Sequence, residues 1–223
     1  MLSLPFTIFT SYKIYYMGTL AETGKKDWQG PEAETRKKGG SQQGSEESAT
    51  YLQKFFRDQL KDMYYAEQEL LKALNELKSA ATTEELEDAI EEHAQQTKRH
   101  VKRLEKVFNM IGQRPEGKRC EAMDGLIKEC KTIIRETEDN TMTRDAALII
   151  AAQKIEHYEI ASYGGLVALA LTMGLGRAAD ILDKTLAEEM DTDQVLTDIA
   201  ENYINVEAEH EGSYSWDKKT WMV

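Results

Sequence analysis

From Thr50 onward, the chain places apolar residues three and four positions apart rather than at every second position. This spacing puts them on one face of an α-helix, whereas a half-buried β-strand would alternate apolar and polar residues. Beyond Ser48 the sequence contains a single proline, Pro115, in a turn over residues 112–117, so the helical pattern is rarely interrupted. The pattern predicts an all-α protein.

Four long helices and one short helix are expected. Acidic residues directly after Thr83 favour a helix start there, and Gly174 and Gly176 favour a helix end. The expected ranges are 50–77, 83–112, 120–137, 144–173 and from 177 onward. Short turns within each pair of long helices, with the short helix as a connector between the pairs, predict an up-down four-helix bundle over residues 49–212.

Each long helix carries an apolar stripe that is expected to face the core, from Leu52 and Phe55 in the first helix to Tyr203 in the last. A carboxylate in a dry helical core costs several kcal/mol unless a partner neutralises it. Several that converge need cations, and helical bundles often hold a pair of metal ions in their cores. We therefore predict a di-metal site from the ionisable residues that interrupt the stripes, which are Glu67, His93, Glu156, Glu159, Glu189 and Asp193.

The sharpest of these signals is Glu156-x-x-Glu159. The i, i+3 spacing puts both carboxylates on one helix face, and Ile155 and Tyr163 indicate that this face points inward. Two like charges in that position destabilise each other unless a metal bridges them or one binds a proton. The alternative is a solvated face on which Lys154, or a base from another helix, pairs with them.

The other candidates each have an ordinary alternative. Glu67 is at the centre of its stripe, but a glutamate at the core boundary can reach past the edge. A lone inward histidine such as His93 is more often a hydrogen-bonded core residue than a ligand. His100 lies on the same face ~10 Å further along the axis, so we expect packing or an outer role for it. Glu189 and Asp193 have i, i+4 spacing and so share one helix face. They lie inside an acidic run, so the alternative is that both are solvated acids.

Side chains that hydrogen-bond to ligating groups usually surround a metal site and orient its ligands. Tyr64, Gln96 and Tyr163 are expected in this supporting role, with ordinary packing as the alternative. The sequence contains no phosphate-cradling glycine loop, no serine or cysteine nucleophile motif and no zinc-type cysteine pairs. Metal chemistry is therefore the function class that the residues favour.

Charge narrows the choice of partners. Residues 1–48 carry six acids and six bases, so the whole net charge of −12 lies on residues 49–223. A polyanionic body repels phosphate backbones, and we expect no nucleic-acid partner. No stretch approaches the ~18–20 apolar residues that span a bilayer, so no membrane association is expected. Cys120 and Cys130 form neither a disulfide framework nor a zinc motif, which favours reduced thiols and a cytoplasmic location.

The ends of the chain differ from its body. Residues 18–48 are rich in Gly, Lys, Glu, Gln and Ser, a composition that cannot bury enough surface to become ordered. We expect residues 1–48 to be a flexible, disordered N-terminal tail, with Met17 as an alternative start of translation. Residues 213–223 are expected to be a short aromatic C-terminal tail.

Three segments carry a resemblance to a known family. They are residues 59–71 (QLKDMYYAEQELL), 118–126 (KRCEAMDGL) and 145–164 (DAALIIAAQKIEHYEIASYG). Over residues 50–208 the chain resembles the YciE/YciF-type ferritin-like stress proteins. The resemblance implies a ferritin-like four-helix bundle related to rubrerythrins, a di-metal centre and a dimeric assembly. The biochemical activity of that family is poorly defined, so the resemblance implies the fold more firmly than the function.

Residue by residue, Glu67 matches the single inward acid of the first ferritin-like helix, and Glu156 and Glu159 match the Glu-x-x-Glu pair of the third. The second and fourth helices depart from the general Glu-x-x-His pattern, because this chain has His93-x-x-Gln96 and Glu189-x-x-x-Asp193. This departure bears on metal identity and redox competence. A rubredoxin-like four-cysteine site, which would supply electrons, does not occur in the sequence.

These observations lead to one main hypothesis and two alternatives. The main hypothesis is a stress-associated protein with two Fe or Mn ions, whose chemistry would be oxidation of Fe(II) by oxygen or peroxide, or removal of peroxide. The first alternative is a non-catalytic structural or interaction protein that binds metal weakly or not at all. The second, a DNA-sheltering mini-ferritin, rests only on the basic run Arg36-Lys37-Lys38.

Overall fold

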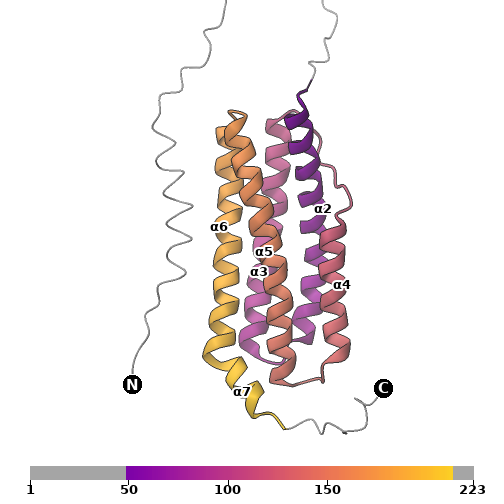
Figure 1. The fold of residues 1–223 in the computed structure, drawn as a ribbon, viewed down its shortest axis with the longest axis vertical. Coiled ribbons are helices and arrows are strands. Elements are labelled where there is room, and N and C mark those ends of the chain that lie inside the picture. Colours follow the sequence, from indigo (N-terminus) through magenta and orange to yellow (C-terminus); the bar gives the residue numbers. More distant parts are fainter. Residues whose placement is uncertain (1–48, 213–223) are drawn as a thin grey trace, which may run out of the picture. The chain divides into compact units, whose positions relative to one another are not determined.

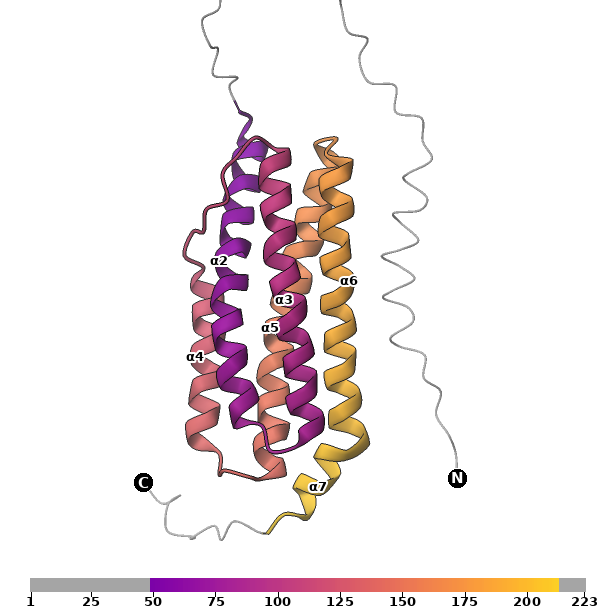
Figure 2. The same ribbon diagram turned by 180° about the vertical axis from the view of Figure 1, so that it is seen from behind.

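The computed structural model describes residues 49–212 of the chain, and the predictions for residues 1–48, including Met17, and for 213–223 lie outside the described residues. Two antiparallel hairpins form the body (Figures 1 and 2). One consists of α2 (Tyr51–Ala80) and α3 (Glu84–Met110), and the other of α5 (Met142–Thr172) and α6 (Gly176–Ile199). A crossover that contains α4 (Glu121–Glu136) joins them.

The four long helices form a closed ring, in which α2 packs on α3 and α5, and α6 packs on α3 and α5. The connector helix α4 lies outside the ring, against α2 and α5. Figure 1 shows the crossover returning the chain to the end of the bundle at which α5 begins. This arrangement confirms the predicted all-α, up-down four-helix bundle with a short connector helix.

Local sequence explains where the helices begin and end. The side chains of Thr50, Thr83 and Thr141 each accept a hydrogen bond from a backbone N–H in the first turn of α2, α3 and α5. Gly112 and Gly174 have φ values of 67° and 73°, which glycine adopts freely because it has no side chain. The helices α3 and α5 therefore end beside these two glycines. The predicted helix ends therefore agree with the structure to within a few residues.

The end of α6 differs from the prediction. After Ile199 the chain forms a π-helical turn, η1 (Ala200–Ile204), and then the short helix α7 (Asn205–His210). A π turn contains one residue more than an α turn, so the stripe rotates after it. Ile204 is fully buried, whereas Tyr203, predicted to face the core, is 43% exposed. The prediction for Tyr203 is therefore wrong.

Leu52 and Phe55 in the first turns of α2 are also more exposed than predicted, at 37% and 53%. The connector α4 and the segment before it lie beside the later part of α2, where the backbone N–H of Lys118 donates to the carbonyl of Lys61. Nothing comparable covers Phe55 in the described part of the chain. The early part of the stripe consequently lines an open groove between α2 and α5.

The core is apolar at both ends of the bundle and polar in the middle. One apolar cluster contains residues such as Leu74, Ile90 and Leu196, and the other contains residues such as Phe56, Phe108 and Leu182. Between them, each of the four long helices contributes at least one ionisable side chain to the interior. The hydrophobic effect does not explain this polar layer, which therefore needs another source of stability.

Candidate metal centre

The polar layer contains four glutamates and two histidines, which we call the buried cluster. Its members are Glu67 on α2, His93 and His100 on α3, Glu156 and Glu159 on α5, and Glu189 on α6. Each is at most 3% exposed. The helical spacing of the stripes places all of them at the centre of the bundle, where water cannot solvate their charges.

The ligand atoms of the buried cluster form two overlapping groups. Within each group, one nitrogen or carboxylate oxygen per residue lies within 4.8 Å of the others. We call His93, Glu156, Glu159 and Glu189 the first position, and Glu67, His100 and Glu189 the second position. Glu189 belongs to both, so a single carboxylate joins them.

At the first position His93 is an uncharged imidazole. Its Nε2 lies 3.2 Å from Oε1 of Glu156, while its Nδ1 lies 3.5 Å from the hydroxyl of Thr192. That hydroxyl in turn donates to Oε1 of Gln96 at 2.9 Å. Burial, together with the charge of His100, lowers the pKa of His93 to about 4. The ring is therefore neutral near pH 7, which is the form that binds metals.

At the second position His100 is surrounded by carboxylates. Its Nδ1 lies 2.9 Å from Oε1 of Glu189 and 3.6 Å from Oε1 of Glu67, and its Nε2 lies 2.8 Å from Oε2 of Glu188. Burial alone would lower the pKa of His100, but its contacts with Glu189 and Glu67 outweigh burial and raise the pKa to about 10. Without a metal, His100 is a buried cation that neutralises part of the cluster.

Glu188 connects His100 to the surface. Its two carboxylate oxygens accept hydrogen bonds from the guanidinium of Arg103, at 2.6 and 2.8 Å. Burial would raise the pKa of Glu188, but Arg103 and His100 lower it to about 2. A carboxylate that holds one histidine nitrogen fixes the ring, so that the other nitrogen faces the cluster, as is common around protein metal sites.

The remaining carboxylates are strongly perturbed. Burial, followed by repulsion from neighbouring carboxylates, raises the pKa of Glu156 and Glu159 well above the usual value. Burial also raises the pKa of Glu189 to about 7, although His100 opposes the rise. Without a cation these carboxyl groups must share protons, because the core cannot hold several negative charges so close together.

The buried cluster is also short of hydrogen-bond partners. Within residues 49–212, nine buried side-chain nitrogen or oxygen atoms have no hydrogen-bond partner, and eight of them belong to the cluster. Three of the eight, Nε2 of His93, Nδ1 of His100 and Oε1 of Glu189, lie within 3.2 Å of an ionisable partner in the cluster. The other five are carboxylate oxygens: Oε2 of Glu67, Glu156 and Glu189, and both oxygens of Glu159. Carboxylate oxygens and imidazole nitrogens together are donors that suit divalent iron and manganese. The atoms present therefore fit a pair of such ions.

Two predicted site residues do not point into the cluster. Asp193 is buried one turn beyond Glu189, but its Oδ1 lies 3.3 Å from Nε2 of Gln153 and 3.4 Å from Nδ1 of His157. The structure thus pairs Asp193 with polar groups of α5, outside both groups of ligand atoms, and its role as a ligand stays a prediction. Tyr64 faces away as well, because its hydroxyl donates to Glu105 at 3.1 Å.

Two supporting residues do reach the cluster. The hydroxyl of Tyr163 donates to Oε1 of Glu67, and Gln96 acts on His93 through Thr192. Lys154, the alternative partner of the Glu156 and Glu159 pair, instead forms an ion pair with Glu129 on α4. Lys154 therefore does not neutralise Glu156 and Glu159.

His100 is the residue that the sequence analysis undervalued. Its distance from His93 along α3 argues against a shared ligand set, but the cluster extends along the bundle axis. Glu67 and Glu189 reach the level of His100, where they form the second position with it. The available signal in the sequence was the place of His100 on the inward stripe of α3, between Thr97 and Leu104.

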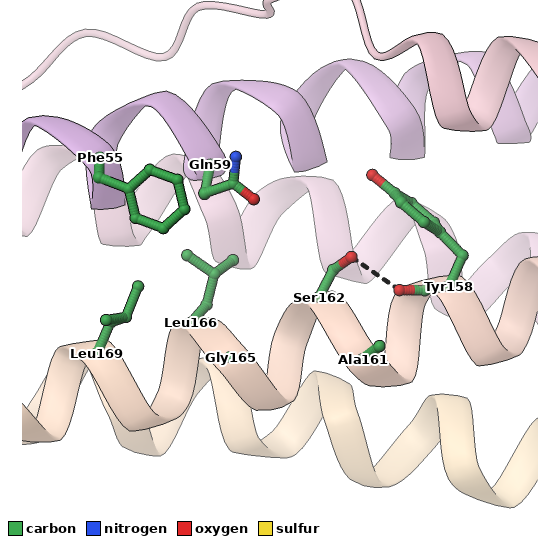
Figure 3. A pocket seen from close by; sticks show the side chains of 8 residues that line it. All are labelled: Phe55, Gln59, Tyr158, Ala161, Ser162, Gly165, Leu166 and Leu169. Carbon is green, nitrogen blue, oxygen red and sulfur yellow. Dashed lines mark hydrogen bonds between the residues drawn. The ribbon is translucent and has the colours of Figure 1, made fainter.

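A groove lies on the outer edge of the bundle, between the early part of α2 and the later part of α5. It has a volume of about 330 Å³ and is lined by Phe55, Gln59, Tyr158, Ala161, Ser162, Gly165, Leu166 and Leu169. Figure 3 shows Phe55 and Gln59 directed toward α5, opposite Leu166 and Ser162. The hydroxyl of Tyr158 lies 3.0 Å from Sγ of Cys120.

None of the helices within residues 49–212 combines the length and the apolar character that crossing a bilayer requires. This agrees with the sequence, which carries charged residues on every long helix.

Residues 51–209 match the family described as "Domain of unknown function (DUF892)". The chain is 45% identical to Protein YciF of Escherichia coli K12 over 152 residues, which covers 68% of this chain and 91% of that protein.

Solved structures show the same fold. The crystal structure of the E. coli stress protein YciF has a TM-score of 0.67 and 42% identity, and covers 70% of this chain and 99% of that one. YcfI from Rhodopseudomonas palustris, for which a structural role has been suggested, has a TM-score of 0.65 and 37% identity, and covers 69% of this chain and 97% of that one.

Proposed function

The chain belongs to the DUF892 family, and from this premise we propose that it is a stress-associated protein that holds two iron or manganese ions in the core of its bundle. One observation carries the proposal. Five buried carboxylate oxygens of the cluster have neither a hydrogen bond nor an ion pair, and the residues that carry them fall into two overlapping groups of ligand size. Leaving so many buried polar atoms unpaired is costly, and divalent cations would remove that cost.

Each residue has a distinct part in this proposal. His93, Glu156 and Glu159 would hold the first ion, Glu67 and His100 would hold the second, and Glu189 would contribute to both. Tyr163 orients Glu67, and Glu188 orients His100 so that Nδ1 faces inward. When bound, two such ions would each lose one electron on oxidation, and the two electrons with two protons would reduce O₂ to peroxide or one peroxide to two water molecules.

A second function is favoured by a specific observation. His100, held between Glu67, Glu188 and Glu189, neutralises part of the cluster without a metal. A structural role has also been suggested for the relative YcfI. On this alternative, the bundle is a non-catalytic structural or interaction protein, and its carboxyl groups keep their protons.

The experiment that separates the two is metal analysis of protein purified without a metal-binding tag, followed by thermal unfolding with and without Fe(II) or Mn(II). We expect about two ions per chain and a clear rise in Tm, as for other proteins whose folded state alone binds the ion. In the double variant Glu156→Ala/Glu159→Ala, the bound ions and the rise in Tm should both be lost.

Asp180→Ala/Asp183→Ala is the matched control, because it removes two exposed acids at the same i, i+3 spacing from α6. It should bind metal like the wild type. Metal-free protein that cannot be reconstituted, with the same Tm in every variant, would establish the structural alternative.

We also propose that the protein forms a homodimer through the outer face of α5. Residues 160–173 contain no charged side chain, although the body carries the whole net charge of −12. Ile150 and Leu171 are 56% and 45% exposed, and Gly165 leaves open space beside the helix. A charge-free face is where two such anionic chains could meet. Light scattering of Gly165→Glu should then give a monomer.

We also propose a cellular location and a partner for the protein. Cys120 and Cys130 are buried and unpaired, which suits the reducing cytoplasm, where we place the protein. The partner of the metal centre would be a small oxidant, oxygen or peroxide. A nucleic-acid partner is disfavoured by the charge of the body.

A further inference from the structure

The outward face of α3 carries its charges in two blocks. Residues 84–92 contain six acidic side chains and no basic one, whereas residues 98–106 contain five basic side chains and a single acidic one. On the neighbouring helix α2 the two signs are mixed, so that Lys54 pairs with Asp58 one turn away at 2.6 Å. The separation of charge along α3 is therefore unlike the ordinary solvated face of its neighbour.

Seven residues, spaced three and four apart, place these charges in one line along α3. We call them the charged stripe: Glu85, Asp88, Glu92, Gln95, Arg99, Lys102 and Lys106. All of them are exposed except Gln95, which is half-buried. The connector α4 packs on α2 and α5 and does not cover α3, as Figure 2 shows. Another molecule can therefore approach the stripe along its length.

The helix dipole explains only part of this pattern. Acids stabilise the first turn of a helix and bases stabilise the last turn, but the effect fades beyond those turns. The dipole accounts for Glu85, which lies in the first turn. It does not account for Glu92 and Arg99 in the middle of the helix, and the last turn of α3 contains no base. The charged stripe therefore needs another explanation.

Most of the charged stripe is without an ion-pair partner in the part of the chain that the structure describes. Glu92 and Arg99 approach each other at 3.6 Å, yet their side chains remain 65% and 47% exposed. The other four charged members of the stripe form no ion pair within residues 49–212. These side chains are hydrated in the single chain and remain available to a partner.

The order of the charges is self-complementary about the middle of the stripe. Glu92 and Arg99 lie equally far from the point between residues 95 and 96. Glu85 and Lys106 do so as well, and the remaining acid and base match to within one residue. A two-fold axis through that point, perpendicular to α3, would align a second copy antiparallel and place each acid opposite a base.

The charges also decide between kinds of partner. A nucleic acid or an anionic lipid surface would be attracted by the basic half of the stripe and repelled by the acidic half, and a cationic partner would meet the reverse. A second copy of this chain meets both halves with the opposite charge. We propose that the charged stripe of α3 is an isologous contact between two copies of this protein, held by ion pairs.

This contact differs from the dimer proposed through the outer face of α5. The helices α3 and α5 occupy opposite corners of the ring, because each packs on α2 and on α6. One chain can therefore use both faces at once, and the stripe contact depends neither on metal nor on the α5 contact. Exposed ion pairs stabilise weakly and are screened by salt, so the stripe contact should be weak and should form at low salt.

The first test is sedimentation velocity of the full chain in about 0.05 M and about 0.5 M NaCl, between which the Debye length falls roughly three-fold. The low-salt sample should contain a larger species whose affinity falls by about ten-fold or more at high salt. The same distribution of species at both salt concentrations would overturn the proposal.

The second test reverses the charge of half of the stripe. Asp88→Lys/Glu92→Lys makes the stripe mostly basic, and Arg99→Glu/Lys102→Glu makes it mostly acidic. Each variant alone should lose the low-salt species, because like charges then face each other. An equimolar mixture of the two variants should regain it, because each acid again lies opposite a base.

Glu136→Lys/Glu138→Lys is the matched control, because it reverses two exposed acids at the end of α4 and changes the net charge as much as the first variant does. It should assemble like the wild type. Two results would overturn the proposal: a low-salt species that persists in either stripe variant, or a mixture that regains nothing although both variants keep the helicity of the wild type.

Crosslinking tests the position of the axis. At the centre of an isologous contact a residue meets its own copy, so Gln95→Cys should form a disulfide-linked dimer under mild oxidation at low salt. Asn109→Cys, which is exposed near the end of α3, would lie far from its own copy and should not crosslink. The native cysteines are buried and give a low background. Equal crosslinking at the two positions would contradict the antiparallel arrangement.

Gly165→Glu distinguishes the two contacts. In about 0.5 M NaCl, where the stripe is screened, this variant should be a monomer, and in about 0.05 M NaCl it should dimerise and crosslink through Gln95→Cys. A Gly165→Glu protein that stays dimeric at high salt refutes the α5 contact and leaves the stripe contact standing. One that stays monomeric at low salt refutes the stripe contact and leaves the α5 contact standing.

Discussion

His93 and His100 lie two turns apart on the same face of α3 and are both buried, yet His93 is neutral and His100 is positively charged. His93 is neutral because burial dominates, although Gln96 and the hydroxyl of Thr192 lie beside its ring. His100 is protonated because carboxylates contact both of its nitrogens. The comparison teaches that the partners a histidine acquires in the fold, rather than its burial, decide its charge.

The two positions built on these histidines therefore differ in kind. The first has a neutral imidazole, a carboxylate pair with raised pKa values and an adjacent cavity of about 20 Å³. The second has a buried cation, a tyrosine hydrogen bond and a connection through Glu188 to Arg103 at the surface. Substitutions at each position test this difference.

Removing the shared carboxylate should abolish the contrast altogether. In Glu189→Ala both positions lose a ligand, and we expect metal content to fall from about two ions per chain to fewer than one. Elemental analysis and the Tm gain with Mn(II) measure this. Asp183→Ala, an exposed acid on the same helix, should retain both ions. Full metal content in Glu189→Ala would show that the two positions do not share a ligand.

Replacing each histidine should separate their roles in the metal-free protein. His100→Ala removes a cation from among Glu67, Glu188 and Glu189, and breaking a buried ion pair costs about 3–5 kcal/mol of unfolding free energy. His93→Ala removes a neutral ring beside an existing cavity and should cost less, about 1–2 kcal/mol. Urea unfolding in the presence of a chelator gives both values. Equal costs would contradict the assigned charges.

The pH dependence of stability should also differ between the positions. Glu189 has a folded pKa of about 7 against an ordinary value of 4.5, so its contribution is fully present below pH 4.5 and is lost as the pH rises through 7. The loss amounts to about 3 kcal/mol. His93, lowered from 6.5 to about 4, contributes stability above pH 6.5 that is lost as the pH falls through 4.

Urea unfolding of metal-free protein between pH 4 and 9 tests both signs. Glu189→Gln should be less sensitive than the wild type on the alkaline side, and His93→Gln less sensitive on the acidic side. The contribution of His100 is present below pH 6.5 and declines between pH 6.5 and about 10, so it adds to the fall above neutrality, and Glu189→Gln isolates the part due to Glu189. A wild-type curve that does not fall between pH 4.5 and 7 would argue against a buried proton on Glu189.

The smallest effect should come from removing one hydroxyl at each position. Tyr163→Phe leaves Oε1 of the fully buried Glu67 without its donor, and should cost about 1–2 kcal/mol. Thr192→Val removes a long contact with His93 and hydrogen bonds to Gln96 and to the backbone carbonyl of Glu188, but leaves no charged group without its donor, and should cost less than ~1 kcal/mol. Chemical unfolding of the two variants side by side measures the difference. A larger loss for Thr192→Val would place the more important support at the first position.

The sequence predicted most of the fold because helices follow local rules. Spacing of apolar residues gave the four long helices, the acidic turn after Thr83 gave one start, and Gly112 and Gly174 gave two of their ends. Apolar spacing failed to predict which side chains are buried where burial depends on neighbouring helices or on a change of helix type. The π turn at Ala200–Ile204 rotated Tyr203 outward, and the first turns of α2 faced a groove that no other described helix covers.

The candidate site was predictable in its residue types and only partly in its membership. Interrupted apolar stripes were enough to select Glu67, His93, Glu156, Glu159 and Glu189, because a charge on an inward face is costly wherever the helix packs. By itself, the sequence thus determined that the centre of the bundle holds excess acid. Only the tertiary structure decided that Asp193 turns toward Gln153, that His100 joins the cluster and that Glu188 supports it. The reason is physical: axial level and side-chain direction depend on how neighbouring helices pack, and helical spacing records neither.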